Sequence, residues 1–132
     1  MLFRSVADLE LQTVYGELRD SNRTPGRDNR LLPHILSARI YNKLQNERVQ
    51  NLLERWAEPW SAITWLEGDE YPAAFLSKSW EWLLQNHPHD SIGGCSIDAV
   101  HDQMETRFEW ASEIAEAITL ERFELLGRQI DL

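Results

Sequence analysis

Apolar side chains recur every three or four residues over most of this chain, a spacing that predicts amphipathic α-helices. The first such block runs from Leu36 to a turn at Gly68-Asp69, with Ser37 as its expected cap. Proline lacks an amide proton and clashes with the preceding helical turn, so we expect the helix to kink at Pro59 or to restart with Pro59 at its first position. The side chains predicted to face inward are Leu36, Ile40, Leu44, Leu52, Leu53, Trp56, Trp60, Ile63 and Leu66.

Two further blocks continue the helical pattern. The second opens at Pro72 and ends before the His87-Pro88 pair, which disfavours helical geometry. The third begins at Ser96, with Asp98 at the positive end of the helix dipole. The predicted inward residues are Phe75, Leu76, Trp80, Leu83 and Leu84 in the second block, and Ile97, Val100, Met104, Phe108, Ala111, Ala115 and Ile118 in the third. Three such stripes bury one another by packing side by side, so the sequence predicts an all-α fold, an antiparallel three-helix bundle.

The first part of the chain does not follow this pattern. We expect residues 1–30 to be an irregular N-terminal extension that serves as a connector, and residues 31–132 to form the bundle. Turn-forming residues cluster between Arg19 and Arg30. The arginines of that segment make it locally basic, which suits a solvated loop, our interpretation, or a contact with an acidic partner.

Composition limits the possible functions. The 132 residues, 42% of them hydrophobic, suffice for one domain with a core and are too few for two. A net charge of −9 would repel a phosphate backbone, so we expect no nucleic-acid partner. No stretch approaches the roughly 18 consecutive apolar residues of a membrane span, and the start lacks a signal peptide's apolar core, so we expect a soluble, cytoplasmic protein without membrane contacts. The single cysteine, Cys95, excludes an internal disulfide, and we interpret it as a small residue in a tight loop.

Two of the six tryptophans are expected to differ in burial. Trp80 and Trp82 lie two positions apart on one predicted helix, so they point to nearly opposite sides. The apolar stripe takes only one of them, and we expect Trp80 inside and Trp82 uncovered. An exposed tryptophan suits a protein contact, which keeps open the alternative of a stand-alone helical interaction module that binds through the face around Trp82.

The loop between the second and third blocks carries the candidate chemistry. His87 and His89 flank a proline, and Asp90 follows. Imidazole nitrogens and carboxylate oxygens bind zinc, but a zinc site usually takes at least three protein ligands. A stand-alone metal-binding bundle would therefore require four histidines to converge, His34, His87, His89 and His101. The alternative requires no ligand: His89 and Asp90 brace the loop, while Gly93 and Gly94 permit its backbone turns.

Three runs of the chain resemble the α-mannosidases of glycoside hydrolase family 38, in their middle domain and the segment leading into it. Residues 37–43 (Ser-Ala-Arg-Ile-Tyr-Asn-Lys) resemble the Ser-x-Arg-x-Tyr-x-Lys run that opens the family's first bundle helix. Residues 80–96, which include His-Pro-His-Asp-Ser-Ile-Gly-Gly, resemble its Leu-Leu-x-Asn-x-x-His-Asp-x-Ile-x-Gly signature. Residues 16–19 look like the end of the catalytic barrel, which implies that the connector 1–30 carries a remnant of that barrel.

The resemblance implies roles for two loop residues. His89 aligns with the histidine that binds the active-site zinc, and Asp90 with the aspartate that contacts hydroxyl groups of the mannose; His87 matches no ligand. In the family, zinc holds two hydroxyl groups of that sugar and helps to distort its ring. We expect no catalytic residue in this chain, because it has neither the family's His-x-Asp-x-x-Trp motif nor a segment like the strand that carries the nucleophile.

The resemblance therefore implies that this chain is one part of a larger enzyme. The chain resembles the middle domain of a zinc-dependent retaining α-mannosidase, which supplies one zinc ligand and one sugar contact and is inactive alone. A lone histidine should bind zinc weakly or not at all until the other ligands are assembled around it. The implied partners are the rest of the parent chain and, in the full enzyme, an α-mannoside or mannosylglycerate-type substrate.

Overall fold

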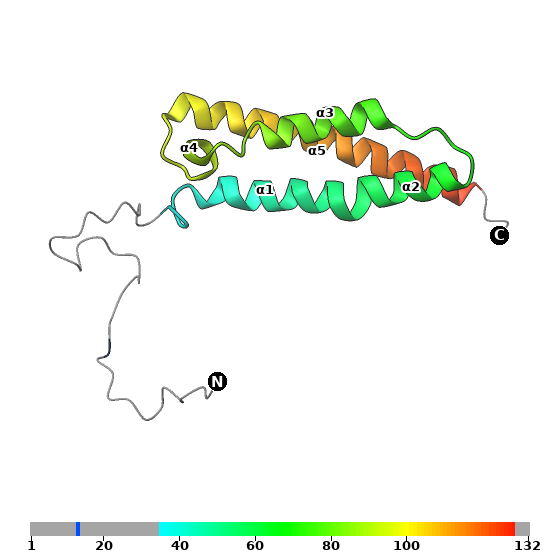
Figure 1. The fold of residues 1–132 in the computed structure, drawn as a ribbon, viewed down its shortest axis with the longest axis horizontal. Coiled ribbons are helices and arrows are strands. Elements are labelled where there is room, and N and C mark those ends of the chain that lie inside the picture. Colours follow the sequence, from blue (N-terminus) through cyan, green and yellow to red (C-terminus); the bar gives the residue numbers. More distant parts are fainter. Residues whose placement is uncertain (1–12, 14–34, 129–132) are drawn as a thin grey trace, which may run out of the picture. The chain divides into compact units, whose positions relative to one another are not determined.

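The computed structural model describes residues 13 and 35–128, and the regular elements of this part are helices. The long helices lie side by side as rods in Figure 1, and a short helix lies at one end of them. The elements are α1 (Ile40–Leu52), a π-helical segment (Leu53–Ala57), α2 (Glu58–Leu66), α3 (Ala73–Leu84), α4 (His89–Ile92) and α5 (Asp98–Gly127). The predicted all-α bundle is confirmed: α1 and α2 make the first rod, α3 the second and α5 the third.

The start of the first helix differs from the prediction. The helix begins at Ile40, and residues 35–39 form turns, so the prediction of Ser37 as its cap is wrong. Arg39 occupies the cap position with a left-handed backbone, φ 44° and ψ 54°. A residue in this conformation cannot continue a right-handed helix, which separates the turns from α1. The other two long helices begin within two residues of their predicted starts, at Ala73 and Asp98.

Pro59 is accommodated by a change of helix type. Pro59 is the second residue of α2, and the backbone stays right-handed helical at Ala57 and Glu58, so the expected end and restart of the helix with Pro59 at its first position is wrong. The preceding segment, Leu53–Ala57, is π-helical, and the Glu58 N–H donates to the carbonyl of Leu53, five residues back. The wider π turn suits a proline, which has no N–H to offer and crowds the helical turn before it.

The buried core runs along the inner faces of all three rods. The third helix buries five of its seven predicted residues, from Met104 to Ile118, whereas Ile97 is 72% exposed. The buried apolar residues are Val49, Leu53, Ala57, Leu76, Leu83, Met104, Phe108, Ala111, Ala115 and Ile118. Phe75 and Leu84, predicted to point inward from the second helix, are 65% and 53% exposed, so this prediction is wrong.

The predicted inward stripe of the first rod is largely wrong. Six of its nine members are at least 40% exposed, namely Leu36, Ile40, Leu44, Trp56, Ile63 and Leu66. The buried face combines Val49, Leu53 and Ala57 with polar residues such as Ser61 and Thr64. The two hydroxyl groups form hydrogen bonds within the rod: Ser61 Oγ donates to the Ala57 carbonyl at 2.6 Å, and Thr64 Oγ1 donates to the Ser61 carbonyl at 3.2 Å. Small side chains let a helix approach its neighbours closely, and most of the bulkier apolar side chains of this rod lie on the outside.

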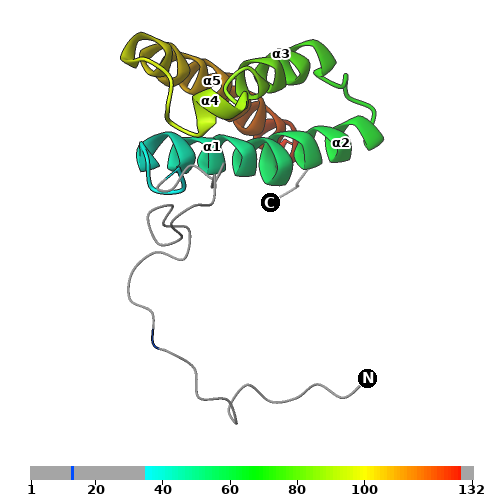
Figure 2. The same ribbon diagram turned by 60° about the vertical axis from the view of Figure 1, so that its left-hand side comes forward.

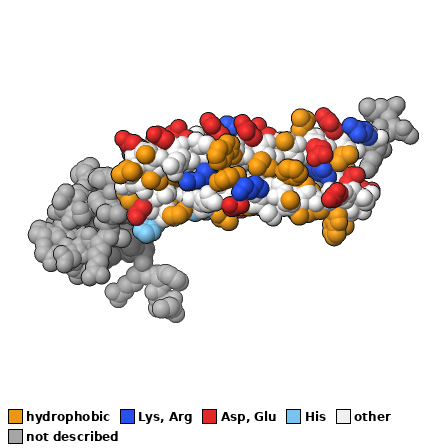
Figure 3. Space-filling view, turned by 90° about the horizontal axis from the view of Figure 1, so that it is seen from above, with side chains coloured by type: hydrophobic (Ala, Val, Ile, Leu, Met, Phe, Trp, Pro, Cys, Tyr) orange, Lys and Arg blue, Asp and Glu red, His pale blue; other side chains and the backbone are white. Residues whose placement is uncertain are grey.

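The two tryptophans of α3 do not divide into buried and exposed. Both are partly buried and pack against the core. Trp80 donates its Nε1–H to Glu58 at 2.7 Å. Trp82 lies on Trp110 of α5, with ring centroids 4.9 Å apart, and carries the Lys78 ammonium 4.1 Å above its ring. The prediction of an uncovered Trp82 is wrong because α5 provides an aromatic partner. The face seen from above in Figure 3 mixes hydrophobic, acidic and basic side chains.

A buried polar pair joins α1 to α5. Asn42 and His101 are 0% and 1% exposed, and Asn42 Nδ2 lies 2.9 Å from His101 Nδ1. A neutral imidazole accepts a hydrogen bond from this amide, which a protonated one cannot do. Burial lowers the pKa of His101 below its ordinary value, and the positive charge of Arg39 lowers it further.

This pair predicts a loss of stability in acid. Because the folded-state pKa of His101 lies below 6.5, the unfolded chain takes up the proton first as the pH falls. The free energy of unfolding should therefore decrease below about pH 6.5, by up to about 1.4 kcal/mol per pH unit from this group. Urea denaturation of the unchanged chain and of His101→Gln between about pH 5 and 8 measures how steeply the free energy of unfolding changes with pH in each. We expect the steeper slope in the unchanged chain. Equal slopes would contradict the prediction.

Part of the sequence prediction falls on residues that the structure does not describe. Apart from residue 13, the connector 1–30 lies outside the described residues, and so does His34. Among the residues that the structure does describe, no helix combines the length and the apolar character that crossing a bilayer requires.

Candidate functional site

The His89-Asp90 pair lies on a one-turn helix at the end of the bundle. Pro88 precedes α4, and His89 and Asp90 are its first two residues. Figures 1 and 2 both show α4 beside the start of α1. The two side chains project outward, with 95% of the imidazole side chain and 62% of the carboxylate side chain exposed. His89 Nε2 lies 3.2 Å from Asp90 Oδ1, so the two polar groups are neighbours on an open surface.

Backbone hydrogen bonds give this turn its shape. The Asp90 carbonyl accepts from the N–H groups of Cys95 and Ser96, each at 3.1 Å, and the His89 carbonyl accepts from Gly93 at 2.8 Å. A Cβ atom on Gly93 would lie 2.4 Å from the His89 carbonyl oxygen, so no larger residue fits there. Gly94 has φ +86°, a left-handed conformation that favours glycine. The interpretation that glycine supplies backbone angles forbidden to other residues is confirmed at Gly94. It is wrong at Gly93, which has ordinary right-handed helical angles, φ −67° and ψ −21°, and where the close carbonyl oxygen is what excludes a side chain.

Cys95 contacts the same carboxylate. Its Sγ lies 3.3 Å from Asp90 Oδ1, and the residue is exposed. This hydrogen bond to Asp90 raises the pKa of the thiol, with a smaller contribution from burial. A raised pKa keeps the sulfur protonated and therefore weakly nucleophilic, in keeping with a small loop residue.

The histidines that the structure describes do not converge. His87 Nε2 lies 2.6 Å from Asn46 Oδ1, which ties it to α1, and His101 is buried against Asn42. His89 faces solvent. Among the described residues, no three histidine, cysteine, aspartate or glutamate side chains are grouped so as to hold a metal ion. The donors present at the turn, one imidazole and the adjacent carboxylate, fit part of a zinc coordination sphere and not a whole one.

Two side chains near α1 contact this turn and were not singled out as site residues from the sequence. Arg39 Nε donates to the Gly94 carbonyl at 3.3 Å, and Lys43 Nζ donates to the Ile92 carbonyl at 2.9 Å. Both belong to the run 37–43 that resembles the family's first bundle helix. The signal was therefore present in the sequence, but residue type alone does not say that these side chains reach the turn.

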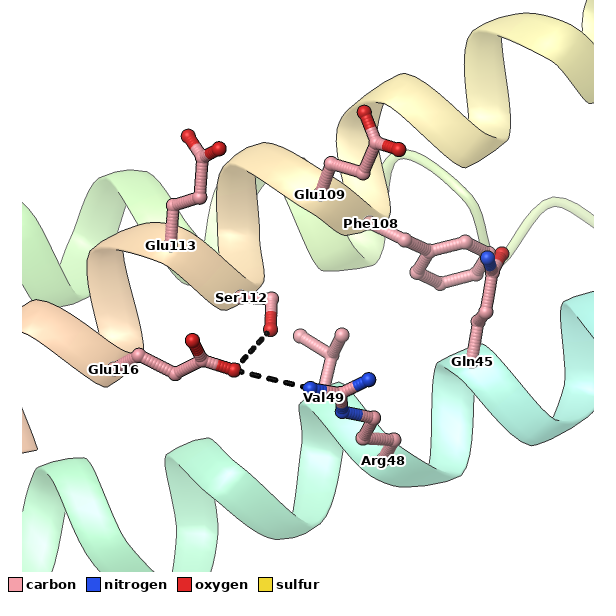
Figure 4. Close-up of a pocket in the computed structure, with 8 residues that line it drawn as sticks. All are labelled: Gln45, Arg48, Val49, Phe108, Glu109, Ser112, Glu113 and Glu116. Carbon is pink, nitrogen blue, oxygen red and sulfur yellow. Dashed lines mark hydrogen bonds and ion pairs between the residues drawn. The ribbon is translucent and has the colours of Figure 1, made fainter.

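A groove of about 310 Å³ between α1 and α5 is a separate feature. In Figure 4, Glu116 bonds to Arg48 at 3.2 Å, while the carboxylates of Glu109 and Glu113 point away from α1. Retaining glycosidases need two carboxyl groups about 5 Å apart across the scissile bond. Because these carboxylates do not face one another, the groove does not have the form of a glycosidase active site.

Comparison with known proteins identifies the domain. The model of the family described as "Alpha mannosidase middle domain" matches residues 32–126. A Halalkalibacterium halodurans protein named "Putative mannosylglycerate hydrolase" is 42% identical over 122 residues, which make up 92% of this chain and 13% of that protein.

Solved structures agree with this match. A glycosyl hydrolase family 38 protein from Enterococcus faecalis superposes with a TM-score of 0.70 and 40% identity, over 92% of this chain and 13% of that one. An alpha-mannosidase from Enterococcus faecalis V583 gives a TM-score of 0.70 and 43% identity, over 72% of this chain and 11% of that one. The chain thus spans about an eighth of the length of these relatives, and it belongs to the α-mannosidase middle-domain family of glycoside hydrolase family 38.

Proposed function

We propose that this chain acts as the middle domain of a zinc-dependent, retaining α-mannosidase, in which His89 supplies one zinc ligand and Asp90 contacts a hydroxyl group of the mannose. The observation that carries the proposal is the exposed His89-Asp90 pair on a braced turn, in a chain of this family. The remaining ligands and the carboxylates of the reaction come from other parts of the enzyme. The chain alone is therefore inactive.

The surroundings of each residue support its role. His89 is 95% exposed at its side chain, so an imidazole nitrogen is accessible to a metal ion that other parts of the enzyme also bind. Asp90 is a carboxylate that accepts hydrogen bonds, as recognition of sugar hydroxyl groups requires. When bound, zinc supplies Lewis-acid chemistry by holding hydroxyl groups of the sugar. His89 would orient that ion, and Asp90 would orient the sugar beside it.

The relatives suggest the class of substrate. One bears the name of a mannosylglycerate hydrolase and another that of an alpha-mannosidase. We therefore propose that the enzyme containing this domain hydrolyses an α-mannosidic bond, in an oligosaccharide or in a mannosylglycerate-type compound. Both substrates present the same mannose hydroxyl groups to Asp90.

The test compares two histidine variants in the full-length polypeptide that carries this sequence. We expect His89→Ala to lose its bound zinc and roughly 100-fold or more of its turnover of an α-mannoside, because it removes a direct ligand. His87→Gln is the matched control, since glutamine can keep the hydrogen bond to Asn46, and we expect it to retain both. Metal analysis and a chromogenic α-mannoside provide the two measurements.

Three results would contradict the proposal. One is retention of zinc and turnover by His89→Ala. Another is measurable α-mannosidase turnover by the purified chain alone. The third is a native polypeptide of only 15.5 kDa in the source cells, detected with an antibody against the chain, because such a product would lack the rest of the enzyme.

A further inference from the structure

The α4 turn is only partly anchored by packing: Ile92, its last residue, is partly buried against the core. None of its four residues is fully buried, and His89 and Asp90 face solvent. An exposed single turn is not stable in isolation, because helix nucleation is unfavourable. The direction in which these two side chains project must therefore be fixed by contacts from outside the turn.

Lys43 of α1 provides one such contact. Its ammonium group donates to the Ile92 carbonyl at 2.9 Å, where α4 ends, and to the Ala38 carbonyl at 2.6 Å, in the turns before α1. Burial lowers the pKa of this lysine. Two charge-assisted hydrogen bonds from one partly buried group thus join α4 to the segment before α1.

Arg39 provides the second contact. Its Nε donates to the Gly94 carbonyl at 3.3 Å, and its Nη2 pairs with Asp98 at the start of α5 at 2.5 Å. The side chain reaches both groups from a left-handed backbone, which is uncommon and costly for a residue other than glycine. A Cβ atom on Gly94 would lie 3.1 Å from the Ala38 carbonyl oxygen, so the two backbone segments are already close together.

We propose that Arg39 and Lys43 are positioning residues for His89 and Asp90: they hold the carbonyl groups of Ile92 and Gly94, which end the turn, and so fix the direction in which the pair projects. The inference rests on the proposed function, because it assigns these side chains a role in aligning the zinc ligand. In other proteins, removing a side chain that orients a metal ligand lowers the affinity for the metal about 10–100-fold. Neither side chain touches the metal or the sugar in this role.

The first experiment measures the turn itself, in the 132-residue chain. The N–H groups of Cys95 and Ser96 report on it, because both donate to the Asp90 carbonyl. In Lys43→Met we expect their hydrogen exchange to be at least about 10-fold faster, with exchange along α5 unchanged. Lys43→Arg should restore protection, since it returns a cation to the same position. Arg39→Lys, which keeps a charge for Asp98 but loses the Nε donor, should also accelerate exchange at these two amides.

Lys78→Met is the matched control. Lys78 is also a lysine in a hydrogen bond, but its partners are Glu81 and the ring of Trp82 on α3. We expect this variant to leave exchange at Cys95 and Ser96 unchanged. Unchanged exchange in Lys43→Met, or acceleration spread evenly over α5, would overturn the proposal, because the lysine would then have no role or a general structural one.

The second experiment measures zinc affinity in the full-length polypeptide by competition with a chelator. We expect Lys43→Met to weaken zinc binding at least about 10-fold, and Lys43→Arg to recover most of that loss. If His89→Ala abolishes zinc binding while Lys43→Met leaves it unchanged, the positioning role is overturned. If His89→Ala itself leaves zinc binding unchanged, the proposed function fails and this role with it, and the exchange measurement still shows separately whether Lys43 holds the turn.

Discussion

Phe108→Ala is expected to lower the free energy of unfolding by about 3–5 kcal/mol. Phe108 is 2% exposed and lies in the core cluster, on the face of α5 that also buries Met104 and Ala111. Removing its ring deletes buried apolar surface and leaves a cavity between rods that pack along their whole length. Urea denaturation followed by circular dichroism measures the loss.

The matched control for this variant is Phe75→Ala. Phe75 is a residue of the same type on α3, but it is 65% exposed, so its removal should change the free energy of unfolding by less than about 1 kcal/mol. Similar losses in the two variants would show that the core does not lie where the structure has it.

Gly93→Ala is expected to lower the free energy of unfolding by about 1–3 kcal/mol, and the structural change should centre on the candidate site. The new Cβ would lie 2.4 Å from the carbonyl oxygen of His89, the same oxygen that accepts the N–H of Gly93. The turn must therefore open and break that hydrogen bond. Urea denaturation measures the loss in free energy of unfolding. Amide chemical shifts measure the structural change, which should centre on His89 and Asp90.

Gly127→Ala controls for the general effect of adding a methyl group to a glycine. Apart from its chain neighbours and the backbone of its own helix, no atom lies within 4 Å of its added Cβ, and Gly127 is the last residue of α5. Alanine has the higher helix propensity, so this variant should be neutral or slightly stabilising. A Gly93→Ala variant as stable as Gly127→Ala would show that the turn has room for a side chain.

The starts of the second and third helices could be predicted from the sequence, and so could the inner face of the third helix, which is apolar at the helical period. In α5, the stripe from Met104 to Ile118 is both the most hydrophobic face and the buried one. Pro72 and Asp98 mark the starts of these helices closely. Where helix propensity, the residues that mark helix ends and the buried face all agree, the hydrophobic pattern is enough to predict the helix.

The first rod could not be predicted in the same way, because its most apolar face is not its buried face. Ser61 and Thr64 are fully buried, whereas Ile63 and Leu66 beside them are 40% and 76% exposed. A prediction based on hydrophobicity places Ile63 and Leu66 in the core instead. Hydroxyl groups that bond within their own helix can be buried at little cost, and residue type alone does not reveal this.

The candidate site was predicted in part. The run around His89 and Asp90 could be picked out because a turn-forming loop with imidazole and carboxylate groups stands between two helical patterns. The contacts that hold this turn were not predicted, since Arg39 and Lys43 are separated from it by about fifty residues. The left-handed backbone of Arg39 has no sequence signal, because few residues other than glycine adopt it.

The π-helical segment Leu53–Ala57 has a consequence for sequence alignment. The buried residues Val49, Leu53, Ala57 and Ser61 follow one another at intervals of four. In a regular α-helix each such interval turns the face by about 40°, so three of them would carry it about 120° around the axis. The wider turn absorbs one residue and keeps all four on one side. When relatives with an unbroken α-helix are aligned with this chain, the one-residue gap therefore belongs within this segment.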